Sequence, residues 1–166
     1  LQSVGAPSAA IGFLVPVREA LALLPQILVA HRVRAMQRRK WVWCVGTAIE
    51  AAALVAMVAT LLTLEGSSAG WAVVTLLAVF ALGRSLASVS YKDVLGKTVS
   101  KTRRGTVSGA AGSIGAAIVL AYGIALASGL LPIETTTLLV GLGMAAALFG
   151  LAAVAFAGLV EEAGAT

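Results

Sequence analysis

Charged side chains are scarce, at 11% of the 166 residues, whereas soluble domains carry about 25%. This deficit excludes a water-soluble globule, because too little polar surface is present to cover one. Cys44 is the only cysteine, which excludes an intrachain disulfide and a cysteine-based zinc cluster. The four prolines and the long apolar runs exclude a disordered chain. Because 60% of the residues are hydrophobic and the mean hydropathy is +1.00, the sequence indicates an integral membrane protein.

Five apolar stretches are long enough to cross a bilayer. A hydrocarbon core about 30 Å thick needs roughly 20 apolar residues in a helix. In lipid only helices and closed barrels satisfy the backbone, and these runs are too long for barrel strands. We therefore predict an all-α, polytopic transmembrane bundle that forms one domain over residues 1–166. The predicted spans are residues 10–30, 41–64, 70–89, 106–131 and 136–160.

The basic residues predict the orientation of these spans. Ten of the twelve lie in two connecting segments, residues 31–40 and 92–104, and the connections at the opposite side have none. Basic connections stay in the cytoplasm, so we expect both segments inside and the N-terminus outside, in a bacterial inner membrane. The positive charge is then a topology signal, and we expect the lipid bilayer as a partner and no nucleic acid. Five spans after an outside N-terminus also predict one further helix before Leu1.

A few ionisable residues lie inside the predicted spans. A charge at the centre of a membrane helix costs about 2.5–3.5 kcal/mol, so such residues usually face a partner or a water-filled cavity. Glu50 lies about 14 Å into its span, near the midplane, and Arg84 lies about 20 Å from the outer surface. Arg18 and Gln26 share one face of the first helix. These four residues are the predicted substrate or proton pathway.

Purely structural roles are the alternatives for the same side chains. Arg18 and Glu19 could reach the outer interface with their charged ends. Glu50 could be protonated and donate a hydrogen bond between helices, and Arg84 could only hold two helices together.

The fourth predicted span carries a stripe of small residues. Gly105, Gly109, Gly112 and Gly115 recur at spacings of three and four, which favours the close approach of another helix backbone. A helix that slides or bends during a working cycle is the alternative.

Catalytic patterns are weak. Ser113 lies in a Gly-Ser-Ile-Gly segment that resembles a nucleophile turn, but the only histidine, His31, belongs to a basic connection outside the bilayer. No metal-ligand spacing and no phosphate-binding loop occurs. We therefore expect no enzyme activity, no metal and no cofactor.

One segment reads PVREALALLPQILVAHRV, and two basic segments follow it, at residues 38–40 and 92–105. Together they resemble parts of the major facilitator superfamily of transporters, in particular its uncharacterised bacterial permeases. PVREALALLPQILVAHRV, residues 16–33, is similar to the family's second helix, and residues 38–40 fit the basic end of its signature loop. Arg84 with Ser88 resembles the family's fourth-helix motif, although serine replaces glycine. Residues 92–105 look like the loop between helices four and five.

This resemblance implies a fragment that covers family helices two to six and lacks the first helix and the C-terminal half, its expected partners. It further implies a secondary transporter that moves a small solute by alternating access, with proton coupling through Glu50 as an option. The candidate gating residues of the cytoplasmic loops are Arg38, Arg39, Lys40, Asp93, Arg103 and Arg104.

Asp93 is the only acid among the ten clustered bases, so we expect it to pair with Arg38 or Arg39 and to hold one conformation closed. Three alternatives to a secondary transporter stay open: a membrane scaffold or assembly protein, an intramembrane enzyme, and a subunit driven by a separate ATPase. The sequence does not name the solute, the direction of transport or the coupling ion.

Overall fold

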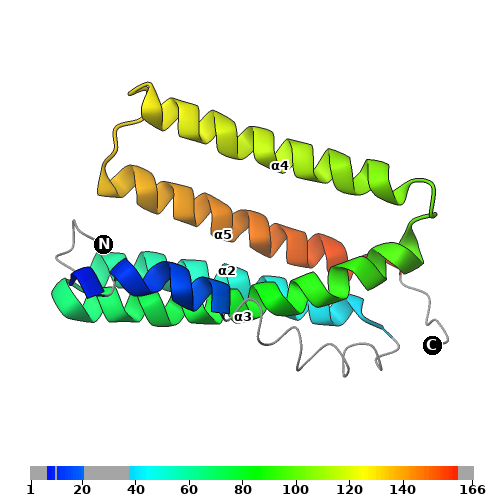
Figure 1. Cartoon of the computed structure of the whole chain (residues 1–166), viewed down its shortest axis with the longest axis horizontal. Coiled ribbons are helices and arrows are strands. Elements are labelled where there is room, and N and C mark those ends of the chain that lie inside the picture. Colours follow the sequence, from blue (N-terminus) through cyan, green and yellow to red (C-terminus); the bar gives the residue numbers. More distant parts are fainter. Residues whose placement is uncertain (1–6, 10, 21–37, 161–166) are drawn as a thin grey trace.

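The computed structural model describes residues 7–9, 11–20 and 38–160, and these residues contain helices and no strand. Residues 11–20 are helical. Four further helices are long and apolar enough to cross a membrane (Figure 1). They are α2 (Lys40–Thr63), α3 (Gly66–Thr98), α4 (Arg104–Ala127) and α5 (Thr135–Ala157). The predicted all-α transmembrane fold is confirmed, and the second half of the first predicted span lies outside the described residues.

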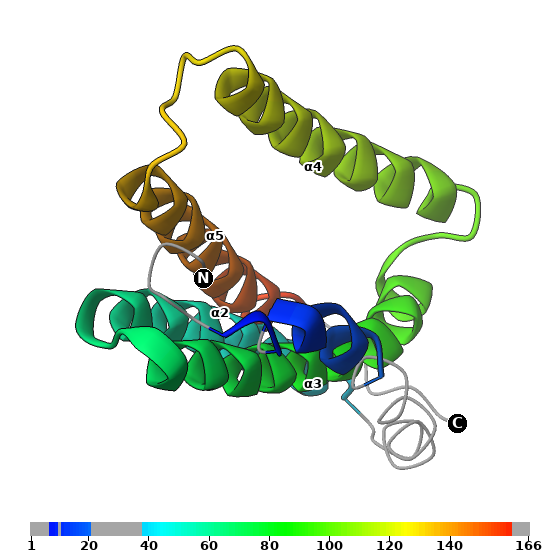
Figure 2. The same cartoon turned by 60° about the vertical axis from the view of Figure 1, so that its left-hand side comes forward.

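Helix α2 is the centre of the bundle, because it packs against both α3 and α5. Leu54 and Met57 of α2 are buried together with Ala146 of α5. Phe80 of α3 and Phe149 of α5 pack around this cluster, edge to face, with ring centroids 5.8 Å apart. In both views α4 lies apart from α2 and α3 (Figure 1, Figure 2), and none of its residues is buried. The packed core is therefore built from α2, α3 and α5.

Two glycines bring the backbones of α2 and α3 into contact. A Cβ atom at Gly46 would lie 2.7 Å from the carbonyl oxygen of Gly83 and 2.8 Å from the amide nitrogen of Ala87. A Cβ atom at Gly83 would lie 2.7 Å from the carbonyl oxygen of Gly46. No larger residue fits at either position without moving a helix backbone. Such small-residue contacts are a common way for membrane helices to associate, because they bring many atoms into van der Waals range.

Helix α3 extends further than the predicted span of residues 70–89, since it continues from Gly66 to Thr98. Its 33 residues correspond to about 50 Å, which exceeds a hydrocarbon core of about 30 Å. The apolar run ends before Lys92 and Asp93, but the helix continues through both residues, because neither residue type breaks a helix. Val94, in this extension, is completely buried. Most of the second basic connection is consequently helical.

Helix α4 ends earlier than predicted, at Ala127 instead of residue 131. Gly129 has a φ of 76°, a left-handed conformation that favours glycine and ends a helix. The close packing expected for the glycine stripe of this helix is wrong for the described part of the chain. A Cβ atom at Gly105, Gly109, Gly112 or Gly115 would have no heavy atom within 4 Å outside its own helix.

The two kinds of glycine predict opposite effects of an added methyl group. We expect Gly46→Ala to lower the free energy of unfolding by about 1–3 kcal/mol, because the methyl group meets backbone atoms. Gly112→Ala is the matched control within α4, and we expect it to be neutral or stabilising by up to about 1 kcal/mol. Unfolding in mixed micelles with increasing dodecyl sulfate measures both. Equal midpoints for the two variants would contradict the α2–α3 contact.

Candidate functional site

Glu50 and Arg84 form an ion pair between α2 and α3. The Glu50 carboxyl oxygen Oε1 lies 3.8 Å from the Arg84 nitrogen Nη1. Gly46 is one helical turn before Glu50, and the Cβ position of Gly83 lies 3.2 Å from the Glu50 Cγ atom. The glycine contact therefore brings the acidic side chain against α3. Both charges therefore lie within helices that are long and apolar enough to span a membrane.

The two members of the pair differ in exposure. Glu50 is almost fully enclosed, with 1% of its side chain exposed, whereas 63% of the Arg84 side chain is exposed. The distance of 3.8 Å between them is longer than a hydrogen bond. Arg84 is near enough to balance the carboxylate charge, and most of its own side chain stays exposed in the described structure.

Two hydroxyl groups are buried in the same interface. Thr47 of α2 and Ser85 of α3 are each 1% exposed. Within the described residues, the oxygens Thr47 Oγ1, Ser85 Oγ and Glu50 Oε1 have no hydrogen-bond partner. Buried polar atoms are normally paired, so an unpaired one requires an explanation, such as a bound water or ion or a catalytic role. The α2–α3 interface thus has a polar centre with unused hydrogen-bonding capacity.

Of the other two predicted pathway residues, Arg18 does not join this centre. Arg18 pairs with its neighbour Glu19, at 3.4 Å between Nε and Oε1, and both side chains are mostly exposed. Gln26 lies outside the described residues.

The predicted gating residues gather at one end of the bundle. Arg39 pairs with Asp93, with 3.1 Å between the Nη1 and Oδ2 atoms, so the expected ion pair involves Arg39. This contact joins the start of α2 to the extended part of α3. Both side chains are partly buried, at 14% and 33% exposed. Arg38 and Arg103 are exposed.

Two of the gating candidates hold the carboxyl ends of helices. Lys40 donates hydrogen bonds through Nζ to the carbonyl oxygens of Ala157 and Leu159, at 2.9 and 2.7 Å. Arg104 donates through Nε to the carbonyl oxygen of Val99 at 2.9 Å, and through Nη2 to that of Gly96. Cations favour helix C-termini because the last carbonyl groups lack partners within the helix. Lys40 therefore ties α2 to the end of α5, and Arg104 ties α4 to the end of α3.

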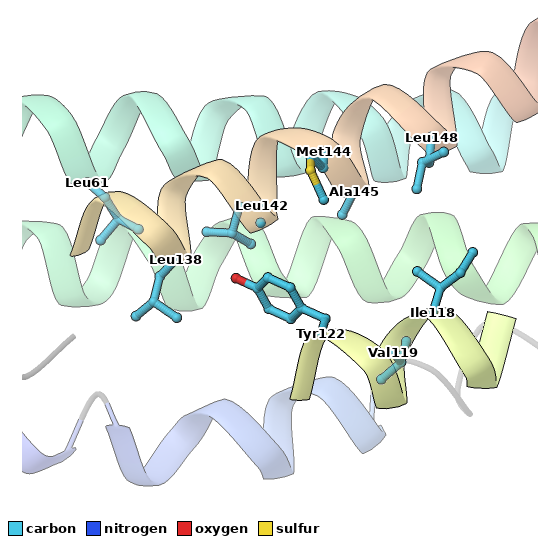
Figure 3. A pocket seen from close by; sticks show the side chains of 10 residues that line it. Leu61, Ile118, Val119, Tyr122, Leu138, Leu142, Met144, Ala145 and Leu148 are labelled. Atoms are coloured by element: carbon cyan, nitrogen blue, oxygen red, sulfur yellow. The ribbon is translucent and has the colours of Figure 1, made fainter. Parts of the chain in front are cut away.

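A separate cavity of about 590 Å³ lies between α4, α5 and the end of α2 (Figure 3). Its lining is apolar apart from Tyr122, whose hydroxyl donates to the carbonyl oxygen of Thr137 at 3.1 Å. Gly141 leaves the space for this ring, since a Cβ atom there would lie 2.6 Å from the Tyr122 hydroxyl oxygen. No predicted site residue lines the cavity. The Glu50–Arg84 pair is the better candidate site, because it places an almost fully buried charge between two helices, whereas the cavity has no charged residue in its lining.

Sequence reasoning missed four residues around this pair: Gly46, Thr47, Gly83 and Ser85. The signal was present but weak, since each is a single small or polar residue in an apolar run. The glycine stripe of α4 is the more regular sequence pattern, but its added Cβ atoms would meet no other helix in the described structure.

Comparison with protein-family models, with curated proteins and with solved structures found no match.

Proposed function

We propose that this chain is part of a secondary transporter of the major facilitator type, which moves a small solute across a bacterial inner membrane by alternating access. The observation that carries the proposal is the Glu50–Arg84 pair between two helices of membrane-spanning length. A buried ion pair is poor evidence of stability, because apolar residues of similar volume often stabilise as well or better. Ionisable pairs inside membrane helices instead mark substrate and ion pathways.

The basic end of the bundle supports the proposed orientation. Lys40 and Arg39 from the first basic segment, and Asp93 and Arg104 from the second, hold the ends of α2, α3, α4 and α5 together. The two segments meet at one end of the bundle, which supports the proposal that both lie in the cytoplasm, as their basic charge favours.

A scaffold or assembly protein is the second candidate. The observation in its favour is α4, which has no buried residue and has five glycines with free space beside them in the described part of the chain. Such a face suits helix association and needs no transported solute. Transport activity separates the two candidates.

Uptake into liposomes tests the proposal and the role of Glu50. The protein from the complete reading frame is reconstituted and screened with labelled solutes over a range of external pH. We expect Glu50→Gln to abolish the pH dependence of uptake, because an amide cannot take up and release a proton. Glu65→Gln is the control, since it removes an exposed carboxylate in the link between α2 and α3. An unchanged pH profile in Glu50→Gln removes this residue from proton coupling, and the absence of uptake for every solute contradicts transport.

The Arg39–Asp93 pair predicts a shift between conformations. We expect Asp93→Asn to weaken the closed conformation by about 1 kcal/mol, a roughly fivefold change in population, because the pair is only partly buried. Distance distributions between spin labels in the complete protein measure the inward and outward populations. Glu134→Gln, at the start of α5, is the control that removes an exposed acid elsewhere. An identical distribution in Asp93→Asn would show that the pair is not a latch.

A further inference from the structure

The guanidinium group of Arg84 has donors that the described structure leaves unused. A guanidinium carries five N–H donors in a flat fork that matches the two oxygens of a carboxylate. Among the described residues Arg84 has one ionic partner, Glu50, through a single pair of atoms 3.8 Å apart. Its side chain is 63% exposed on a helix of membrane-spanning length. A cation in that setting calls for a further anionic partner.

Glu50 depends on Arg84 for its charge balance. The helices packed against α2 are α3 and α5. Helix α5 has no ionisable residue between Thr135 and Ala157, and α3 contributes Arg84 at this level. On α2 itself, Lys40 is bound to the end of α5, and Cys44 lies nearly two turns away. If another anion engaged Arg84, the enclosed Glu50 carboxylate would be left without a counter-charge, which is strongly unfavourable.

The exposed face of α3 beside Arg84 offers one more polar group. Ser88 lies one turn further along the helix and is exposed, so its hydroxyl is on the same side as the guanidinium. A guanidinium fork with a hydroxyl one turn away suits a carboxylate, which accepts from both.

We propose that Arg84 and Ser88 form the recognition site for a small monoanionic carboxylate, whose binding replaces Glu50 as the counter-ion of Arg84. Glu50 then takes up one proton from a protonated buffer molecule in the solvent: the N–H bond of the buffer cation breaks, and the O–H bond of the carboxylic acid forms. The site is neutral before and after this exchange. A dianion would leave an uncompensated negative charge, and a neutral or cationic solute would not replace Glu50. The inference rests on the proposed transport function and specifies its substrate class as organic monoanions.

Titration calorimetry with sodium acetate tests the site in the chain itself, in lipid nanodiscs. Two buffers whose protonated forms are cations, Tris and imidazole with the same concentration of chloride, give the number of protons taken up without a carboxylate or phosphate buffer that could compete. We expect saturable binding with about one proton taken up per acetate. We expect Glu50→Gln to bind acetate with no proton uptake. The double variant Glu50→Gln with Arg84→Gln should bind at least tenfold more weakly, and it stays neutral, so that folding is preserved.

Lys101→Gln is the matched control, because it removes an exposed positive charge outside the predicted spans and should bind acetate as the unaltered chain does. Sodium sulfate should bind more weakly than acetate. The site is refuted if acetate does not bind, if the double variant binds it equally well, if no proton is taken up, or if sulfate binds better.

Failure of this inference and failure of the transport proposal give different results. Uptake of a neutral solute by the complete protein, without acetate binding, refutes the carboxylate site and retains transport. Acetate binding with proton uptake, in a complete protein that moves no solute, supports the site and refutes transport.

Discussion

The backbone contact between Gly46 and Gly83 determines how near α2 and α3 can lie to each other. Because neither residue has a side chain, the carbonyl oxygen of each helix lies where the other would need a Cβ atom. This approach encloses Glu50, one turn further along α2, and brings it within reach of Arg84. A larger residue at either glycine would separate the helices and give lipid or water access to the carboxylate. The Glu50–Arg84 pair therefore depends on two glycines that have no functional group themselves.

The charged residues of the chain have two different structural roles. At one end of the bundle, Lys40 and Arg104 satisfy the last carbonyl groups of neighbouring helices, and Arg39 pairs with Asp93. These contacts use side chains at the helix termini, where backbone groups lack partners. Within the apolar helices, Glu50 and Arg84 form an ion pair with each other, and neither side chain caps a helix. The basic residues at one end therefore join the helix ends, whereas the Glu50–Arg84 ion pair lies between helices that are long and apolar enough to span a membrane.

Much of this fold follows from the sequence, because apolar runs of about 20 residues have few alternatives in lipid. The ends of the helices were predicted less well, since α3 continues through Lys92 and Asp93 and α4 ends early at Gly129. Helix propensity and glycine conformation, not hydropathy, decide those boundaries.

For the site, the sequence predicts that Glu50 and Arg84 lie within apolar spans, whereas their pairing depends on how each helix is rotated about its axis. When a helix is apolar on all sides, its hydropathy pattern does not indicate which face packs against a neighbour. The ion pair of Asp93 could be predicted more easily, because a single acid among bases has few possible partners. In the structure its partner is Arg39.

The central claim is that Glu50 and Arg84 are direct neighbours inside the membrane. Solid-state NMR on the chain in lipid bilayers measures this, with ¹³C in the Glu50 carboxyl group and ¹⁵N in the Arg84 guanidinium group. The distance of 3.8 Å between Oε1 and Nη1 brings the labelled carboxyl carbon and guanidinium nitrogen close enough for measurable dipolar transfer. The transfer should disappear in Gly46→Leu, which separates the helices, and persist in Gly112→Leu. Absence of transfer in the unaltered chain would contradict the account.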